Sequence, residues 1–596
     1  MMKNLSYKQI YEAYLDFFQK NGHAIIPSAP LVPENDPSVL FVNAGMFPLV
    51  PFLKGQEHLK GKRLVNIQRC IRTGDIDEVG NNYHCTAFIM LGNWSLNDYF
   101  KKEAINMTVE FFTKELGLDI NNIYASVFEG DENTPQDIES IEVWKEIFSK
   151  YGIDAKVGDG ERIQPLGKKE NWWGLESGGP CGPDSEIFYD TGKEKCGEEC
   201  NVSCNCGKYV EIGNNVFMEY QKDGDKTTPL GRHNVDFGGG LERLTALLQN
   251  VDSVYDTDIY KPIMDKVKKL SQVEDIKSQR IIVDHIKAAT WIIMDGVAPS
   301  RTQQGYILRR LIRRAVRHGR KLGIETSFCK EVANIAIEQF KDIWEGLETE
   351  RENILTVIDT EEEKFNRTLE RGLRELDKMV QKKNIIDGKD AFLLYETYGL
   401  PLEVTEEILQ EKNIKLENRE LFQETEKEHQ EKSRTAAKGF FEGGLADKSE
   451  MSIKYHTASH LLLVALRKVL GEHVYQKGSN ITPERLRMDF PNETKLTPEQ
   501  VKEVEDIVNE QIQKGLEVTF VEKDKDEALK LVPFAAFSEK YADKVKVYYI
   551  GPVDNPFSVE ICNGPHVDNI KELGKFKIIK QENVGAGVKR IKAILE

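Results

Sequence analysis

The sequence predicts an α+β protein of several domains, and three observations lead to this prediction. The chain has 596 residues, and at roughly 150 residues per domain this length favours three or four domains over one core. Up to about residue 250, short strand-like runs alternate with glycine-rich turns and a few amphipathic helices. Helical periodicity then dominates to about residue 438, and strand-like runs return after residue 450.

The first predicted domain, residues 1–250, is expected to be built around a mostly antiparallel sheet. The runs SVLFVNAGM, EIFYD and VFMEY have the composition of strands, and MTVEFFTKEL has the apolar spacing of a helix. The second predicted domain, residues 251–438, is helical, with periodic segments such as QRIIVDHIKAATWIIMDG. Residues 439–450, GFFEGGLADKSE, are expected to be a linker.

The third predicted domain, residues 451–596, is again α+β. The helical run HTASHLLLVALRKVLG precedes the strand-like runs VTFVEKD, VKVYYIG and GKFKIIK.

Composition excludes several classes of protein. Hydrophobic residues make up 40% of the chain and charged residues 30%, which is typical of packed globular domains. The net charge of −17 argues against a protein that coats nucleic acid through bulk positive charge, but it leaves room for a local basic surface. We find no apolar run of about 18 residues and neither a signal-peptide nor a transit-peptide pattern at the N-terminus. We therefore expect a cytoplasmic protein without a membrane partner, whose nine cysteines are thiols rather than a disulfide framework.

The run NVDFGGGLERLTALLQ combines groups that can hold a small charged substrate. Asp236 can bind an ammonium group, the glycines let a ligand approach the backbone, and Arg243 falls in the first turn of a helix that begins at about Leu241. Such a run is also common in a plain strand-to-helix connection, and it is neither a GxGxxG nor a Walker motif.

Two further residues upstream are candidates for the same site. Arg72 ends a strand-like run in RCIRTGDIDEVG, and with Arg243 it can supply two guanidinium groups for a triphosphate. Trp173 in NWWGLESGGPCGP can form an aromatic wall, although a tryptophan more often packs in a core.

These segments together resemble the alanyl-tRNA synthetases, a family of class II aminoacyl-tRNA synthetases. The matching strings, in order, are FVNAGM, RCIRTGDIDEVG, MLGNWSLNDYFK, NWWGLESGGPCGPDSEIFYD, VFMEY, VDFGGGLER, DHIKAATWIIMDGVAPS and GYILRRLIRRAVRHG. The resemblance implies that Arg72 and Arg243 bind ATP with Mg²⁺ as cofactor. It also implies a pocket for alanine and its adenylate, formed by Trp173, Asn214, Val216, Asp236 and Gly238. Two positions depart from the family pattern, because the loop after Arg72 is short and Ile89 stands where Glu is common.

Residues 301–321 contain eight Lys or Arg and no Asp or Glu. The apolar residues recur at helical spacing, which leaves a set of arginines for other faces of the helix: Arg309, Arg310, Arg313, Arg314 and Arg317. We expect a phosphate-binding stripe, with a plain solvated face as the alternative. The resemblance implies that Arg313 and Arg314 contact the acceptor stem of tRNA(Ala), and that Gln303 and Glu396 read its G·U pair. The family usually has Asn and Asp at these two positions, so each side chain here is one methylene longer.

Four residues of the third domain have the chemistry of a zinc site. His456 and His460 are spaced i, i+4 on a predicted helix, and Cys562 and His566 follow in CNGPH. The missing Glu after His456 argues against an HExxH metalloprotease. The domain resembles the editing domain of the alanyl-tRNA synthetases, and this resemblance implies that Zn²⁺ is bound there and that Gln476 belongs to the editing site.

A second cysteine group has two open interpretations. Cys196, Cys200, Cys204 and Cys206 lie within eleven residues, and their spacing is tighter than in common zinc knuckles. They are either ligands of a second, structural zinc or a loop of free thiols.

The resemblance therefore implies ATP-dependent attachment of alanine to tRNA(Ala), together with hydrolysis of mischarged Ser-tRNA(Ala) and Gly-tRNA(Ala). A non-catalytic tRNA-binding relative and an editing hydrolase with an inactive synthetase part are the alternatives. We expect a monomer, because the family's further C-terminal module has no counterpart before the last residue, Glu596.

Overall fold

The computed structural model divides into two compact units, Met1–Arg419 and Glu420–Glu596, called unit 1 and unit 2 below. The described residues are 3–33, 39–175, 178–224, 226–383, 385–428, 449–492, 494–532, 544–562, 564–585 and 587–596. The expected linker at 439–450 therefore lies almost wholly outside the described residues. Among the residues that are described, none of the helices has the length and apolar character needed to cross a membrane.

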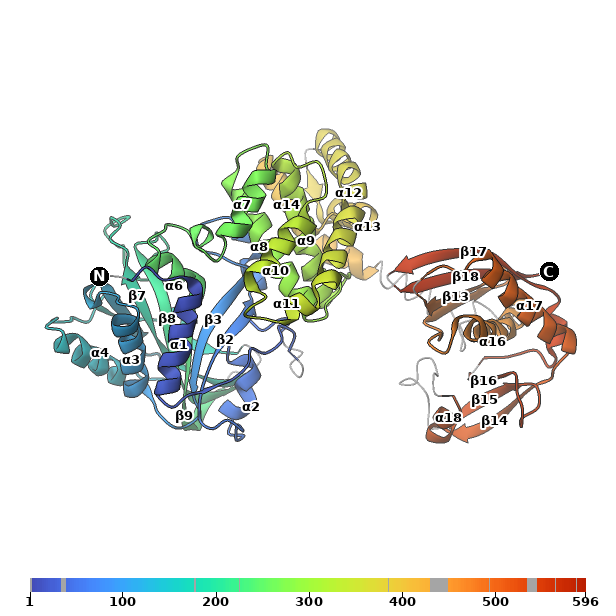
Figure 1. The fold of residues 1–596 in the computed structure, drawn as a ribbon, viewed down its shortest axis with the longest axis horizontal. Coiled ribbons are helices and arrows are strands. Elements are labelled where there is room, and N and C mark those ends of the chain that lie inside the picture. The colour runs from blue at the N-terminus through green and yellow to red at the C-terminus, as the bar shows by residue number, and fades with distance from the viewer. Residues whose placement is uncertain are drawn as a thin grey trace. The chain divides into compact units, whose positions relative to one another are not determined.

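Unit 1 contains a nine-stranded sheet in the order β1-β2-β3-β9-β8-β7-β4-β5, with β6 paired to β7 (Figure 1). Its central pairs, β2 to β3, β3 to β9, β9 to β8 and β8 to β7, are antiparallel, and only β1 with β2 and β4 with β5 are parallel. The strands are β1 (Ala24–Ile25), β2 (Arg63–Ile71), β3 (Ala87–Ser95), β4 (Ile123–Phe128), β5 (Ile163–Leu166), β6 (Trp172–Gly174), β7 (Gly179–Asp190), β8 (Tyr209–Asp223) and β9 (Lys226–Gly240). The predicted antiparallel sheet is confirmed.

Helices cover one face of this sheet and leave much of the other face for a pocket. The covering helices are α1 (Tyr7–Lys20), α3 (Lys101–Glu110), α4 (Ile138–Lys150) and α6 (Leu241–Leu248), with the short α2 (Val50–Leu53) and α5 (Lys168–Asn171) elsewhere on the sheet. Side chains alternate along β8, so Phe217 packs into the helix-covered core while Val216 belongs to a smaller cluster on the opposite face.

A helical bundle follows in the chain and completes unit 1. Its helices are α7 (Lys261–Leu270), α8 (Ile276–Met294), α9 (Gln303–Lys321), α10 (Cys329–Phe340), α11 (Gly346–Thr349), α12 (Arg351–Lys382), α13 (Gly388–Tyr398) and α14 (Leu402–Glu411). Two short strands, β10 (Ile386–Asp387) before α13 and β11 (Leu416–Glu417) after α14, pair with each other in parallel. Figure 1 shows the bundle beside β2 and β3, and α8 contacts β3. One apolar core runs from α1 through the sheet into α12, so it continues across the expected domain boundary at residues 250 and 251.

Unit 2 is an α+β domain, as the sequence predicts, and its strands form two sheets. One sheet has the order β12-β13-β18-β17 and the other β14-β15-β16. The elements are α16 (Glu450–Leu470), β12 (Gly478–Thr482), β13 (Arg485–Pro491), α17 (Pro498–Lys514), β14 (Val518–Asp524), α18 (Lys525–Leu531), β15 (Lys544–Ile550), β16 (Ser558–Ile561), β17 (Phe576–Gly585) and β18 (Val588–Leu595). The Thr497 hydroxyl and the Gln500 side chain form a capping box that starts α17, and Gly515 ends it in the left-handed conformation.

One expected strand is absent. SVLFVNAGM is irregular in its described residues, 39–46, although EIFYD and VFMEY lie in β7 and β8 as expected. Val42 N–H donates to the Leu31 carbonyl, and the Val42 carbonyl accepts from Ile71 N–H at the end of β2. Four of its apolar residues, Phe41, Val42, Ala44 and Met46, are buried by packing in a loop, whereas Leu40 is exposed.

Candidate functional site

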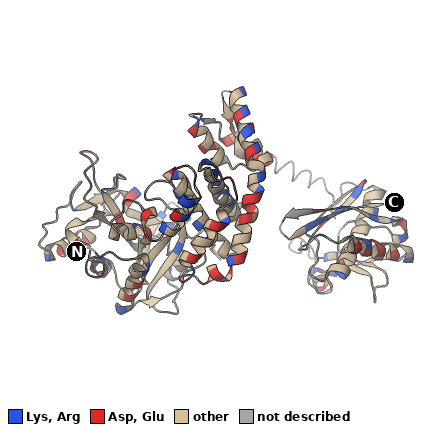
Figure 2. Ribbon diagram, turned by 45° about the horizontal axis from the view of Figure 1, so that its top comes forward, with Lys and Arg blue, Asp and Glu red and all other residues tan. Residues whose placement is uncertain are grey.

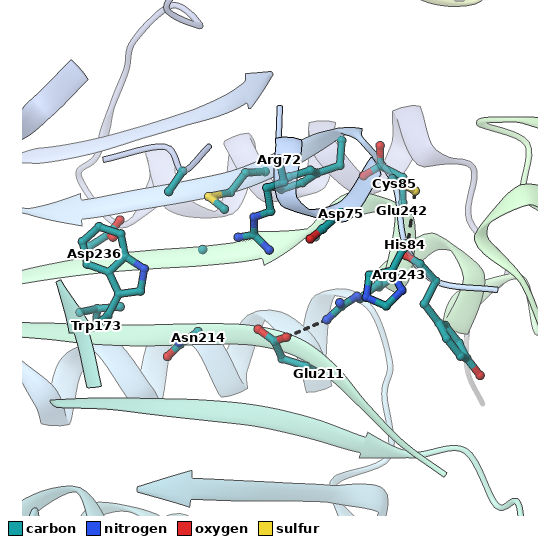
Figure 3. Close-up of a pocket in the computed structure, with 17 residues that line it drawn as sticks. Arg72, Asp75, His84, Cys85, Trp173, Glu211, Asn214, Asp236, Glu242 and Arg243 are labelled. Carbon is teal, nitrogen blue, oxygen red and sulfur yellow. Dashed lines mark hydrogen bonds and ion pairs between the residues drawn. The ribbon is translucent and has the colours of Figure 1, made fainter. Parts of the chain in front are cut away.

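A pocket on the open face of the unit 1 sheet gathers the residues that the sequence singled out in this domain. It is lined by all seven of them: Arg72, Trp173, Asn214, Val216, Asp236, Gly238 and Arg243. In Figure 3, Trp173 and Asp236 lie at one end, Arg243 and Glu211 lie at the other, and the Arg72 guanidinium points into the space between. The pocket therefore has two chemically different ends.

Strand register explains how four of these residues come together. Asn214 pairs with Gly238, and Val216 pairs with Asp236, across β8 and β9. Because side chains two residues apart share a face, the four positions form one patch of the sheet. A β-carbon at Gly238 would lie only 3.2 Å from the Met90 sulfur, so the glycine keeps the floor of the pocket low.

Asp236 is the acidic group at the tryptophan end. Its side chain is buried, and desolvation raises the pKa of the carboxyl to about 7. A cationic ligand in contact with this carboxyl would favour the ionised form. The site is thus suited to an ammonium group of a small substrate.

Two arginines from different elements line the rest of the pocket. Arg72 follows β2 directly, its guanidinium lies 4.7 Å from the centre of the Phe88 ring, and none of the ion pairs among the described residues involves it. Arg243, in the first turn of α6, forms a 2.7 Å ion pair with Glu211 (Figure 3). Both guanidinium groups can reach a polyphosphate.

The strand that carries Ile89 is held by a buried ion pair instead of by a glutamate at that position. Ile89 is fully buried, and its backbone N–H donates to the Glu242 carboxylate at 3.0 Å. Glu242 pairs with Lys287 of α8 at 3.2 Å, and Lys287 also donates to the Ala87 carbonyl and to the Tyr260 hydroxyl. These contacts join β3, α6 and α8 behind the pocket.

Sequence reasoning missed further residues that line the pocket, among them Asp75, His84 and Glu211. Strict alternation along β8 would place Glu211 on the face opposite Asn214. However, Ile187 pairs with Gly213 and Phe188 pairs with Glu211, so Ile212 is an extra residue and forms a bulge. The bulge shifts the alternation by one position and turns Glu211 toward the pocket.

The expected stripe of exposed arginines on α9 is wrong. The structure instead buries four of its five members: Arg310, Arg313, Arg314 and Arg317 are each 3–7% exposed. Ion pairs hold these side chains, such as Arg313 with Glu361 at 2.5 Å and Arg317 with Glu411 at 2.6 Å. All the acidic partners lie far along the chain, most of them in α12 and α14, which is why the local sequence shows none. Figure 2 shows acidic and basic residues interspersed over the helices of unit 1.

Two of these arginines fix the loop at residues 72–86, which connects β2 to β3. Arg310 pairs with Asp77 at 2.6 Å, and Arg314 donates to the Ile76 carbonyl at 2.8 Å while pairing with Glu407. Burial alone would raise the pKa of Glu407, but His318 and Arg314 hold it below its ordinary value. The short loop that follows Arg72 is thus held by the helical bundle.

Gln303 and Glu396 are both exposed, on α9 and α13 respectively. Gln303 is the first residue of α9 and has a positive φ of 52°. The ring of Tyr306, one turn later in α9, lies 6.3 Å from the ring of Tyr395, which precedes Glu396. This ring contact places the first turn of α9 beside α13, so the two positions belong to neighbouring elements.

Unit 2 brings together the four residues that the sequence predicts as zinc ligands. One ligand atom from each of His456, His460, Cys562 and His566 lies within 4.8 Å of the others, and the Cys562 sulfur is 3.2 Å from His456 Nε2. Burial lowers the pKa of His456 to about 4 and of His460 to about 3, so these imidazoles are neutral near pH 7.

The outer contacts of these histidines are those of metal ligands. His456 Nδ1 lies 3.0 Å from the Pro565 carbonyl, and His566 Nδ1 lies 3.1 Å from the Thr457 hydroxyl, so each ring uses Nδ1 outward. His566 Nε2 is buried without a hydrogen-bond partner among the described residues. An inward nitrogen of this kind fits a bound zinc ion.

Gln476 lies just before β12, and its side-chain amide donates to the Ser479 hydroxyl at 3.2 Å. Its role in the editing site stays a prediction. Cys196, Cys200, Cys204 and Cys206 also form a cluster, in unit 1.

Comparison with known families agrees with this geometry. A family model described as tRNA synthetases class II (A) matches residues 9–475. A second, described as Threonyl and Alanyl tRNA synthetase second additional domain, matches residues 545–592. Fold, pocket and family models together define a class II tRNA synthetase with an additional domain.

Curated relatives show which family of class II tRNA synthetases the chain belongs to. The alanine–tRNA ligase of Treponema denticola is 48% identical over 613 residues, with 100% of both chains covered. That of Borrelia hermsii is 47% identical, with 98% of this chain and 99% of the relative covered, and that of a Thermoanaerobacter species is 35% identical, with 80% of the relative covered. The chain belongs to the alanyl-tRNA synthetase family.

We expect the affinity for alanine to depend on the ionisation of Asp236. A carboxyl with a pKa of about 7 is largely protonated below pH 7, and it then lacks the charge that attracts an ammonium group. The KM for alanine in ATP–pyrophosphate exchange should therefore rise as pH falls from 8 to 6. Asp236→Asn should raise this KM at every pH and remove that rise. A KM that decreases as the pH falls from 8 to 6, or an unchanged KM in Asp236→Asn, would contradict the assignment of Asp236 as the group that binds the alanine ammonium.

Proposed function

We propose that this protein attaches alanine to tRNA(Ala) in two steps and removes wrongly attached serine or glycine at a second site. The observation that carries the proposal is the two-ended pocket, with one buried carboxyl and one aromatic wall at one end, Arg243 at the other, and Arg72 pointing into the space between. The first end suits the ammonium group of an amino acid, and the second suits the phosphates of ATP.

In the first step, an alanine carboxylate oxygen attacks the α-phosphorus of ATP, and pyrophosphate leaves. Asp236 holds the ammonium group and orients the carboxylate, while Arg72 and Arg243 stabilise negative charge on the phosphates. Little proton transfer is needed, so positioning and charge stabilisation carry this step.

Mg²⁺ fits the phosphate end, because the Asp75 and Glu211 carboxylates line it and Mg²⁺ prefers oxygen ligands. When bound, the ion neutralises phosphate charge.

In the second step, a hydroxyl of the terminal ribose of tRNA attacks the carbonyl carbon of the adenylate, and AMP leaves. Gln303 and Glu396 are suited to read a G·U pair, since an amide and a carboxylate offer the donor and acceptor groups that base edges require. Their exposure and the packing of α9 against α13 support this role. Arg313 and Arg314 act in the proposal as buried supports for this surface and for the 72–86 loop, instead of as phosphate contacts.

Editing follows from the energetics of the pocket. A pocket that accepts alanine cannot strongly exclude glycine, which lacks one methyl group, because such a difference is worth about 1–3 kcal/mol. Serine adds only one hydroxyl. A second, hydrolytic site for mischarged tRNA is therefore part of the proposal.

We assign the hydrolytic site to unit 2, where His456, His460, Cys562 and His566 would hold Zn²⁺. Four protein ligands fill a tetrahedral shell, which is the arrangement of a structural zinc. When bound, the ion crosslinks α16 to the segment that follows β16. The hydrolytic pocket thus depends on zinc for its shape, and Gln476 is proposed to line it.

Replacing Cys562 with Ala should remove zinc and hydrolysis together. We expect the zinc content to fall by one atom per chain and the deacylation of Ser-tRNA(Ala) to be lost, because α16 is no longer tied to residues 562–566. Charging with alanine should persist, since its pocket lies in unit 1. Cys329→Ala, which alters a buried cysteine of unit 1 outside both clusters, is the matched control. Undiminished zinc with full deacylation would refute the site.

The proposed function is tested by charging two tRNA(Ala) transcripts that differ only in one base pair of the acceptor stem, G·U or G·C. We expect the wild-type protein to charge the G·U transcript with alanine and to discriminate against G·C. Gln303→Ala should cost about 1–3 kcal/mol, selectively on the G·U transcript, because one base-edge contact is lost. Gln304→Ala, at the adjacent position, is the control.

No charging of either transcript would overturn the proposed function. Equal use of both transcripts by the wild type would overturn only the assignment of Gln303 and Glu396.

A further inference from the structure

A long connection beside the ATP end of the pocket contains nearly half of the cysteines in the chain. Residues 191–208 join the end of β7 at Asp190 to the start of β8 at Tyr209, and they contain neither helix nor strand. Connections of this length without regular structure are uncommon in compact domains. Four of the nine cysteines lie in this loop: Cys196, Cys200, Cys204 and Cys206.

The four sulfurs converge on one point. All lie within 4.8 Å of one another, with 3.3 Å between Cys196 and Cys204 and 3.6 Å between Cys200 and Cys206. A disulfide would require about 2.05 Å. A tetrahedral zinc with bonds of about 2.3 Å separates its sulfur ligands by about 3.8 Å, which lies within the observed range.

Hydrogen bonds from Thr191 and Lys208 tie the two arms of the loop together. Between the arms, its described residues reach the rest of unit 1 mainly through one hydrogen bond from Asn201 to Asp159 and one apolar cluster. Cys200 and Val202 are buried and pack on Phe188 and Tyr209, forming a small separate cluster, while Cys196 is exposed. A small apolar cluster does not offset the entropy of ordering so many residues. A metal that crosslinks four points of the loop would supply the missing constraint.

We propose that Cys196, Cys200, Cys204 and Cys206 bind a second zinc ion, which is structural and separate from the site in unit 2. The four thiolates fill a tetrahedral shell and leave no position for a substrate or water. Thiolates are soft ligands, which select zinc over the oxygen-preferring Mg²⁺ of the neighbouring pocket.

The proposed ion would also support the ATP pocket. Gly207, which follows Cys206, lies against Tyr83 so closely that a β-carbon there would be 2.2 Å from the Tyr83 hydroxyl. Tyr83 lines the same pocket as Arg72 and Arg243, and it belongs to the 72–86 loop. Lys193, on the other arm of the cysteine loop, pairs with Asp252 at 2.9 Å. Loss of the zinc should therefore raise the KM for ATP more than the KM for alanine.

The test is a zinc count on the full chain, purified under reducing conditions, with the unit 2 site removed by His456→Ala and Cys562→Ala together. We expect two zinc atoms per chain in the wild type and one in this double variant. Adding Cys196→Ser and Cys204→Ser should lower the count to zero. Adding Ser203→Ala and Asn205→Ala, at exposed positions of the same loop, should leave it at one.

A second readout does not depend on how the cysteine variants fold. The His456→Ala, Cys562→Ala variant reconstituted with Co²⁺ should show the visible absorption of a tetrahedral cobalt thiolate. A zinc-free double variant would overturn the proposal. It would also be overturned if thiol titration of the denatured, unreduced chain gave four thiols fewer than the number of cysteines, because the four sulfurs would then form disulfides. Iron found in place of zinc would overturn it as well.

Discussion

The buried ion pair between Lys287 and Glu242 is the interaction on which the geometry of unit 1 depends. Lys287 has no exposed side-chain surface, and Glu242 is 3% exposed. Glu242 accepts from the backbone of Ile89, and Lys287 donates to the carbonyl of Ala87. Because an unpaired buried charge costs several kcal/mol, the two partners keep β3, α6 and α8 in one arrangement. Glu242 is also next to Arg243, so the same pair sets where the phosphate end of the pocket lies.

The helical bundle supports the pocket by a second route, through buried arginines of α9. Arg310 and Arg314 reach the 72–86 loop, whose first residue, Arg72, points into the pocket. The first turn of the same helix carries Gln303 on the surface. One helix thus joins the proposed acceptor-stem surface to the loop that carries the proposed ATP ligand Arg72.

Much of the fold and of the pocket could be predicted from the sequence. Asp236 and Gly238 stand in one short run before a helix, so the local sequence was enough to predict their place in the pocket. The candidate metal cluster of unit 2 follows from the i, i+4 spacing of two histidines and from a nearby Cys and His. The position of Glu211 could not be predicted from the sequence, because it depends on a bulge at Ile212 that only strand pairing defines. The burial of the α9 arginines could not be predicted either, because their ion-pair partners Glu361 and Glu407 lie about fifty to one hundred residues further along the chain.

The central claim is that unit 1 activates alanine in a pocket whose parts are held by the Lys287–Glu242 pair. The direct test is alanine-dependent ATP–pyrophosphate exchange without tRNA, measured for the wild type and for Lys287→Met, with circular dichroism to confirm that the variant is folded. We expect exchange by the wild type and a loss of more than about tenfold in the variant, since Glu242 is left buried without its partner. Absence of exchange in the wild type, or undiminished exchange in a folded Lys287→Met, would contradict the account.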